Sequence, residues 1–195
     1  MLIISHRVNT ITDLLNTPNN FGIEVDVRSW KKQIILQHEP YEEGVLFSEW
    51  LKYLNHKFII LNIKNEGIEV NTIKELLLAK QDIEYFLLDQ SFPMFARTIM
   101  ADTQSTAMRI SNLESPQYLE QIKPKWVWLD SHNGNWDYLH NSIEFIVNSG
   151  SKVCIASPEL HGRSPLNEIN EIKAVFESKK IEINAVCTKI PENWE

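Results

Sequence analysis

Two carboxylates placed two positions apart are the residues of this chain best suited to chemistry. Glu24 and Asp26 stand in the β-branched run 22–27, and alternate residues of a strand project from the same face. Carboxylates directed at one point repel each other unless a cation lies between them, and apolar neighbours make their burial costly. We therefore expect a divalent cation, Mg2+ or Ca2+, to bind at Glu24 and Asp26, with a solvated strand face as the alternative.

Two histidines stand near these carboxylates in the sequence. His6 ends the apolar segment 2–6, and His38 follows the short extended segment 33–37. Imidazole is the side chain that exchanges protons near neutral pH, so His6 and His38 predict a metal-assisted acid/base site. The alternative for each histidine is a structural role, in which it only satisfies a buried hydrogen bond.

Arg7 and Lys64 offer fixed positive charge to an anionic ligand. Arginine suits bidentate contact with phosphate, whereas lysine acts as a point charge. The alternative is a structural network in which both cations pair with Glu24 or Asp26, and the two roles are compatible.

Apolar strands alternate with amphipathic helices along the chain. We expect strands at 2–6, 22–27, 58–64, 85–89, 106–110, 126–130, 152–156 and 184–188, and helices at 10–15, 47–54, 70–80, 94–100, 116–122, 137–149 and 165–179. Such alternation indicates a parallel sheet covered on both faces. It favours an α/β fold, a compact (β/α)8 TIM barrel rather than an open doubly wound sheet. Residues 1–195 would form a single domain, with the last helix reduced to the tail at 191–194.

Polar residues gather where these predicted strands end. In a barrel such ends meet at the face that carries the active site. We therefore expect Arg109 and Glu159 to contact the substrate, beside Asp89 and Asp130. The loop 161–165 precedes a helix, and two roles stay open for it: phosphate binding at the helix N-terminus, or capping of the helix alone.

The totals exclude several kinds of partner. With 195 residues, a net charge of −7 and a pI near 5.4, the chain lacks the basic face needed for nucleic acid or an anionic membrane. We find no charged-then-apolar leader and no apolar run of spanning length, so we expect a cytoplasmic protein without a membrane span. Cys154 and Cys187 stand in apolar runs and should be buried, reduced thiols. The sequence carries no signal for an oligomeric state.

The order of these features resembles the glycerophosphodiester phosphodiesterase family, within the superfamily of phosphatidylinositol-specific phospholipase C-like phosphodiesterases. The resemblance rests on His6 with Arg7, the pair Glu24 and Asp26, His38 after a short hairpin, and Lys64 at the end of the third strand. It implies a (β/α)8 barrel, the two histidines as general acid and base, and a divalent cation held by acidic residues. It also implies phosphate contacts from the two cations, a small-molecule phosphodiester substrate and a role in lipid metabolism.

The chain departs from the family pattern at two positions and in the segment after His38, which is too short to form the substrate-covering insertion of larger members and should leave the pocket open. The family's His-Arg-Gly ends here in Val8, and the glutamate expected two residues before Lys64 is Asn62. Asn62 is then the third metal ligand, through its amide oxygen, and the missing charge should lower the metal affinity. Asp89 or Asp130 is an alternative source of the missing carboxylate. The segments 62–64 (NIK) and 157–163 (SPELHGR) are similar to those of a shorter group of such proteins.

Three functions are compatible with the sequence. The first is a metal-dependent phosphodiester hydrolase with a histidine pair as acid and base. The second is a catalytically silent barrel that binds a phosphorylated sugar or a polysaccharide precursor, which the substitutions at Val8 and Asn62 would suit. The third is a different barrel lyase or hydrolase that uses the same carboxylates on a substrate without phosphate.

Overall fold

The computed structural model describes residues 1–194, which divide into two compact units. One unit is Ser5–Thr98, and the other combines Met1–Ile4 with the chain from Ile99 onward. Strands alternate with helices in both units, so the predicted α/β class is confirmed. The closed barrel and the single domain stay predictions.

The unit Ser5–Thr98 is built on three parallel strands and a hairpin. Its elements are α1 (Ile11–Asn16), β2 (Gly22–Trp30), β3 (Gln33–Leu36), β4 (Val45–Leu46), α2 (Phe47–Trp50), the 3-10 turn η1 (Leu51–Tyr53), β5 (Phe58–Ile63), α3 (Glu69–Ala79), β6 (Glu84–Leu88) and the first part of α4 (Phe92–Ala101). Strands β2, β5 and β6 pair in parallel, whereas β3 folds back antiparallel on β2. All six residues of β5 are buried, as expected for a parallel strand covered on both faces.

The register between β2 and β5 positions the predicted site. Glu24 lies opposite Ile60 and Asp26 lies opposite Asn62, so three polar residues meet within an otherwise apolar pair of strands. Strand β2 runs on to Trp30, beyond the predicted end at residue 27, because the hairpin with β3 extends its pairing. The hairpin also returns the chain toward β2 just before His38.

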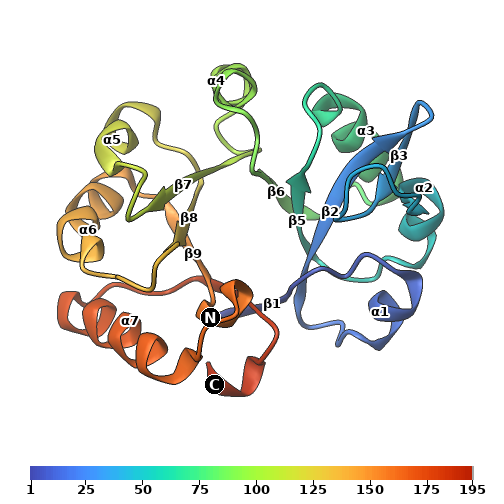
Figure 1. The fold of residues 1–195 in the computed structure, drawn as a ribbon. Coiled ribbons are helices and arrows are strands. Elements are labelled where there is room, and N and C mark those ends of the chain that lie inside the picture. The colour runs from blue at the N-terminus through green and yellow to red at the C-terminus, as the bar shows by residue number, and fades with distance from the viewer. Residues whose placement is uncertain (195) are drawn as a thin grey trace. The chain divides into compact units, whose positions relative to one another are not determined.

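The second unit repeats the alternation of strand and helix. Its elements are β1 (Leu2–Ser5), β7 (Ala107–Ser111), η2 (Pro116–Tyr118), α5 (Leu119–Ile122), β8 (Trp126–Asp130), α6 (Tyr138–Ser149), β9 (Lys152–Ala156), η3 (Pro158–His161), α7 (Pro165–Lys179), β10 (Ala185–Thr188) and η4 (Pro191–Asn193). Strands β7, β8, β9 and β10 pair in parallel in that order, and β1 neighbours β10. Figure 1 shows α5, α6 and α7 on one side of these strands.

Several predicted elements lie where the sequence placed them. Helix α7 has the predicted bounds, and the tail forms only the short turn η4, as expected for a reduced last helix. Cys154 and Cys187 are buried, and neither forms a disulfide within residues 1–194, as predicted. No helix of the described residues is long and apolar enough to cross a membrane.

Candidate active site

Strand β2 carries two buried carboxylates in the unit Ser5–Thr98. Glu24 is 1% exposed and Asp26 is 0% exposed. Burial and the neighbouring charge of Asp26 raise the pKa of Glu24 to about 7. The nearby charge of Lys64 and the hydrogen bonds to Glu24 are therefore too weak to offset its burial and the charge of Asp26.

Two asparagines hold these carboxylates in place. Asn62 Nδ2 donates to Glu24 Oε1 at 2.9 Å. Asn9 Nδ2 donates to Asp26 Oδ2 at 2.8 Å, and Asn9 Oδ1 accepts from the backbone N–H of Asp26 at 2.8 Å. Sequence reasoning missed Asn9, because no local pattern marks a contact between residues 17 positions apart.

Both predicted cations contact the carboxylates. Lys64 Nζ lies 3.3 Å from Asp26 Oδ1 and 3.7 Å from Asp89 Oδ2. Arg7 Nε lies 3.7 Å from Asp26 Oδ2, and the backbone N–H of Arg7 donates to Glu24 Oε2 at 2.7 Å. The structural network expected as an alternative is thus present. It leaves the Arg7 side chain 41% exposed and accessible to a ligand.

The turn after β1 brings the backbone of Arg7 to Glu24. Arg7 has a φ of 57°, a left-handed conformation that costs a non-glycine residue about 1–2 kcal/mol. Val8, which replaces the family's glycine, has no positive φ and is 3% exposed in the core. The turn therefore needs no glycine at position 8, and the valine adds apolar packing.

The two predicted histidines contact different members of this network: His6 lies near Glu24, and His38 contacts Arg7. His6 Nε2 is 3.9 Å from Glu24 Oε2. His38 Nε2 is 2.5 Å from Arg7 Nη2, and its Nδ1 is 2.5 Å from Glu39 Oε1. Because a guanidinium only donates hydrogen bonds, this geometry suits the neutral ring that accepts at Nε2 and carries its proton on Nδ1, toward Glu39.

Arg28 fixes the backbone that carries His38, and sequence reasoning missed it. Its Nε and Nη2 donate to the carbonyl oxygen of His38 at 3.0 and 2.8 Å, and its Nη1 donates to that of Lys64 at 3.4 Å. Arg28 lies on the same strand face as Glu24 and Asp26, two positions further along β2. That continued alternation is the signal that could have identified it.

The predicted substrate residue Arg109 belongs to the other unit, where it pairs with Asp130. Arg109 Nη1 donates to Asp130 Oδ2 at 2.8 Å, and His161 Nε2 lies 2.6 Å from Asp130 Oδ1. Burial alone would raise the pKa of Asp130, but the His161 hydrogen bond and the Arg109 charge outweigh it. The pKa of Asp130 therefore lies below its usual value. We call these three residues the Asp130 cluster.

Glu159, the other predicted substrate residue of this unit, joins η3 to the end of β10. Its Oε1 accepts from Thr188 Oγ1 at 2.6 Å and from the Lys189 backbone N–H at 2.9 Å. Its Oε2 accepts from the hydroxyl of Ser157. These contacts are structural, and contact between Glu159 and a substrate stays a prediction. In the neighbouring loop 161–165, Ser164 precedes α7 but its side chain makes no capping hydrogen bond.

Comparison with known proteins identifies the fold. No protein-family model and no curated protein matches the sequence. Three solved structures, all described as glycerophosphodiester phosphodiesterases, match over nearly the whole chain. The protein from Parabacteroides distasonis aligns with a TM-score of 0.69 and 13% identity over 98% of this chain and 93% of its own. The protein from Agrobacterium tumefaciens aligns with a TM-score of 0.62 and 15% identity over 99% of this chain and 97% of its own. The protein from Thermotoga maritima aligns with a TM-score of 0.64 and 13% identity over 96% of this chain and 93% of its own.

The chain has the fold of the glycerophosphodiester phosphodiesterases. The resemblance first drawn from the order of short motifs therefore extends to the three-dimensional structure. At 13–15% identity this likeness concerns the fold, whereas the roles of individual residues depend on the contacts described above.

The polar atoms of β2 and β5 suit the divalent cation expected in a glycerophosphodiester phosphodiesterase-like site. Asp26 Oδ1 and Asn62 Oδ1 are buried and make no hydrogen bond with any described residue. With the Glu24 carboxylate they form a set of oxygen donors, the type that Mg2+ and Ca2+ prefer. Within residues 1–194, no three His, Cys, Asp or Glu side chains are grouped to hold a metal. The third donor here is an amide, so the site carries less charge than three carboxylates would.

Proposed function

We propose that the chain is a metal-assisted phosphodiesterase that cleaves a small-molecule diester of the glycerophosphodiester class. The observation that carries this proposal is the convergence of two imidazoles, two cations and two buried carboxylates within the unit Ser5–Thr98. The three structural neighbours are glycerophosphodiester phosphodiesterases, which supports the same activity. A cytoplasmic location and a role in lipid metabolism belong to this proposal.

Glu24, Asp26 and Asn62 would hold the divalent cation, Mg2+ or Ca2+. When bound, the cation would supply positive charge to a non-bridging phosphoryl oxygen. It would also favour ionisation of Glu24, whose raised pKa arises from burial and from the nearby charge of Asp26.

Arg7 and Lys64 would bind the phosphate. The Arg7 guanidinium contacts His38 and Asp26 in the free protein, and an anionic diester offers it a stronger, bidentate partner. As Arg7 turns toward the phosphate, Nε2 of His38 becomes available. The Arg7 side chain would thus couple substrate binding to the availability of His38 as the general base.

The two histidines would carry the protons. His38 would accept, at Nε2, the proton of the attacking hydroxyl, which by resemblance to the family is the substrate's own neighbouring hydroxyl. Glu39 would hold the opposite N–H of the ring and so stabilise the imidazolium that forms. His6, near Glu24, would donate a proton to the leaving oxygen.

The test is hydrolysis of glycerophosphocholine with and without Mg2+ or Ca2+. We expect metal-dependent turnover, and His6→Ala and His38→Ala should each lower kcat by roughly 100-fold or more, the range for loss of a general acid or base. His140→Ala, an exposed histidine on α6, is the matched control and should leave turnover unchanged. Undiminished turnover in either site variant would contradict the assignment. Absence of cation binding in calorimetry at millimolar concentration would favour a silent binding protein instead.

A further inference from the structure

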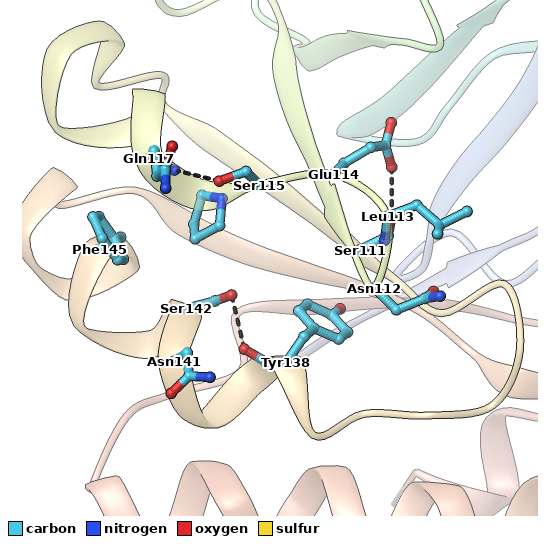
Figure 2. A pocket seen from close by; sticks show the side chains of 11 residues that line it. Ser111, Asn112, Leu113, Glu114, Ser115, Gln117, Tyr138, Asn141, Ser142 and Phe145 are labelled. Carbon is cyan, nitrogen blue, oxygen red and sulfur yellow. Dashed lines mark hydrogen bonds between the residues drawn. The ribbon is translucent and has the colours of Figure 1, made fainter.

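A pocket of about 350 Å³ lies in the second unit, which includes the chain from Ile99 onward. None of the residues proposed above for catalysis lines it. It is bordered by the segment Ser111–Gln117, which runs from the end of β7 into η2, and by four residues of α6, namely Tyr138, Asn141, Ser142 and Phe145 (Figure 2). Its volume is at the lower end of the range for ligand pockets, about 300–1,000 Å³. The size suits a small molecule.

The lining of the pocket is polar but almost uncharged. No lysine, arginine or histidine occurs among the described residues that line it, and Glu114 contributes its carboxylate. An anionic ligand would therefore meet no cationic side chain in the lining and would be repelled by Glu114, whose Oε2 lies 3.9 Å from Nε2 of His132 outside the lining. The pocket selects against phosphate, sulfate and carboxylate groups.

Three side-chain amides provide hydrogen-bonding groups for a ligand. Those of Gln117 and Asn141 make no hydrogen bond with the described residues. Asn112 uses only its oxygen, which accepts from the backbone N–H of His132 at 2.9 Å. Since each amide offers a donor and an acceptor side by side, it matches a group that both donates and accepts, such as a pair of adjacent hydroxyls.

Internal hydrogen bonds fix the rest of the lining before any ligand binds. Ser111 Oγ donates to Glu114 Oε2 at 2.8 Å and accepts from the backbone N–H of Leu113 at 3.1 Å. The Tyr138 hydroxyl donates to the backbone oxygen of Asp130 at 2.8 Å, and the Tyr138 ring stacks on Trp136 with centroids 6.0 Å apart. Such pre-ordering lowers the entropy lost when a ligand binds.

Two aromatic rings complete the lining. Tyr138 and Phe145, both on α6, provide apolar surface next to the amides. A sugar ring or a polyol has this same combination, apolar C–H faces edged by hydroxyl groups. These amides are exposed or half-buried and can bond to water, so an apolar ligand that displaced this water without replacing its hydrogen bonds would lose about 1–3 kcal/mol for each group it buried.

We propose that this pocket binds an uncharged saccharide or polyol. The site is separate from the proposed phosphodiesterase chemistry, since it shares no residue with it. Glu114 and the three amides bind the hydroxyl groups, while Tyr138 and Phe145 contact the carbon skeleton.

The test is NMR titration of the protein with D-glucose, N-acetyl-D-glucosamine and glycerol, with inorganic phosphate as the anionic probe. We expect saturable shifts of the Asn112, Gln117 and Asn141 signals with at least one neutral probe and none with phosphate. Asn141→Ala should weaken that binding by about tenfold, the effect of losing roughly 1.4 kcal/mol of hydrogen bonding. Asn148→Ala, an exposed asparagine on the same helix, should bind as the unsubstituted chain does.

Three outcomes would overturn the proposal. These are the absence of saturable shifts with all three neutral probes, equal affinity in Asn141→Ala, and phosphate shifting the same signals. Both asparagines are exposed, so neither substitution threatens the fold, and circular dichroism verifies this. Binding by His6→Ala at unchanged affinity would show that the result is independent of the proposed catalytic site.

Discussion

Two buried clusters of this protein use the same residue types and reach opposite electrostatic states. In the first, the Glu24 cluster of Glu24, Asp26 and Asn62, two carboxylates lie on one strand and the pKa of Glu24 is raised to about 7. In the Asp130 cluster a single carboxylate lies between Arg109 and His161, and its pKa is lowered. Burial acts in the same direction on both carboxylates, so the neighbouring charges decide the difference.

The partners of each oxygen explain the contrast. Glu24 accepts from the neutral Asn62 amide and from the backbone N–H of Arg7, and neither carries a full charge. Each oxygen of Asp130 instead faces an arginine or a histidine. The hydrogen-bond donors of Glu24 therefore supply no full positive charge, which suits a bound cation, whereas the Asp130 cluster already holds its own counter-charges.

Replacing each carboxylate by its amide should separate the two clusters most clearly. Asp130→Asn leaves Arg109 without its buried anionic partner and should lower the free energy of unfolding by about 3–5 kcal/mol. Glu24→Gln removes a repulsion and should change it by no more than about 1 kcal/mol. Urea denaturation in EDTA measures both. A larger loss in Glu24→Gln than in Asp130→Asn would refute the contrast.

The pH dependence of stability should reveal the raised pKa of Glu24. Between its ordinary value of 4.5 and about 7, the folded protein keeps a proton that the unfolded chain has lost. The free energy of unfolding should therefore fall by about 2–3 kcal/mol as the pH rises through this window. Denaturation from pH 4.5 to 8 in EDTA measures the slope, and Glu24→Gln should flatten it.

Asp130 should act in the opposite direction and in another window. The lowered pKa of Asp130 means that its carboxyl group gives up the proton more readily in the folded protein than in the unfolded chain. Its stabilising effect is therefore lost as the pH falls below about 3.8.

A divalent cation provides the control for the pH dependence that arises from Glu24. If a saturating cation left the slope between pH 4.5 and 7 unchanged, the cation would not bind at Glu24.

That Glu24, Asp26 and Asn62 lie close together was predictable because the pattern is local, while their role as metal ligands stays a prediction. Alternation in β2 puts Glu24 and Asp26 on one face, and the position of Asn62 near the end of the next parallel strand brings it level with them. The strands and helices were predictable for the same reason, since apolar periodicity acts over a few residues. The register between β2 and β5 required the structure.

Contacts between distant segments were not predictable. Asn9 binds Asp26 because the turn after β1 folds onto β2, and Arg28 binds the His38 carbonyl because the hairpin returns there. Glu159 was placed correctly near a strand end, but its partners Thr188 and Lys189 come from another strand. A sequence shows which residues at a strand end are polar. It does not show which of them already have hydrogen-bond or ion-pair partners within the protein.

Replacing Asn62 by a carboxylate residue should make the Glu24 cluster more negative. Asn62→Glu adds a third anionic ligand and should raise the affinity for Mg2+ or Ca2+ by about tenfold or more, since ligand charge controls affinity. In EDTA the same variant should be less stable than the unsubstituted chain, because three carboxylates then repel one another. Asn62→Gln, which has the same length without the charge, is the matched control. Calorimetry measures the affinity, and equal affinity in both variants would exclude position 62 as a ligand.

Replacing the arginine of each cluster should have the smallest effect on the free energy of unfolding in the case of Arg7. Arg109 is 22% exposed and tightly paired, whereas Arg7 is 41% exposed and shared between Asp26 and His38. Arg7→Gln should therefore cost less than about 1 kcal/mol of stability, as for an exposed ion pair, while Arg109→Gln should cost more.

The informative change in Arg7→Gln concerns the proton on His38. With Arg7 present, the contacts favour the neutral tautomer of His38 that accepts at Nε2 and carries its proton on Nδ1. Without the guanidinium, both neutral tautomers become accessible, and the side-chain ¹⁵N shifts of His38 should move toward their average. Inorganic phosphate added to the unsubstituted protein should move them the same way if it draws Arg7 away, while His140 stays unchanged. Shifts that respond to the substitution but not to phosphate would mean that Arg7 positions His38 without linking it to the substrate.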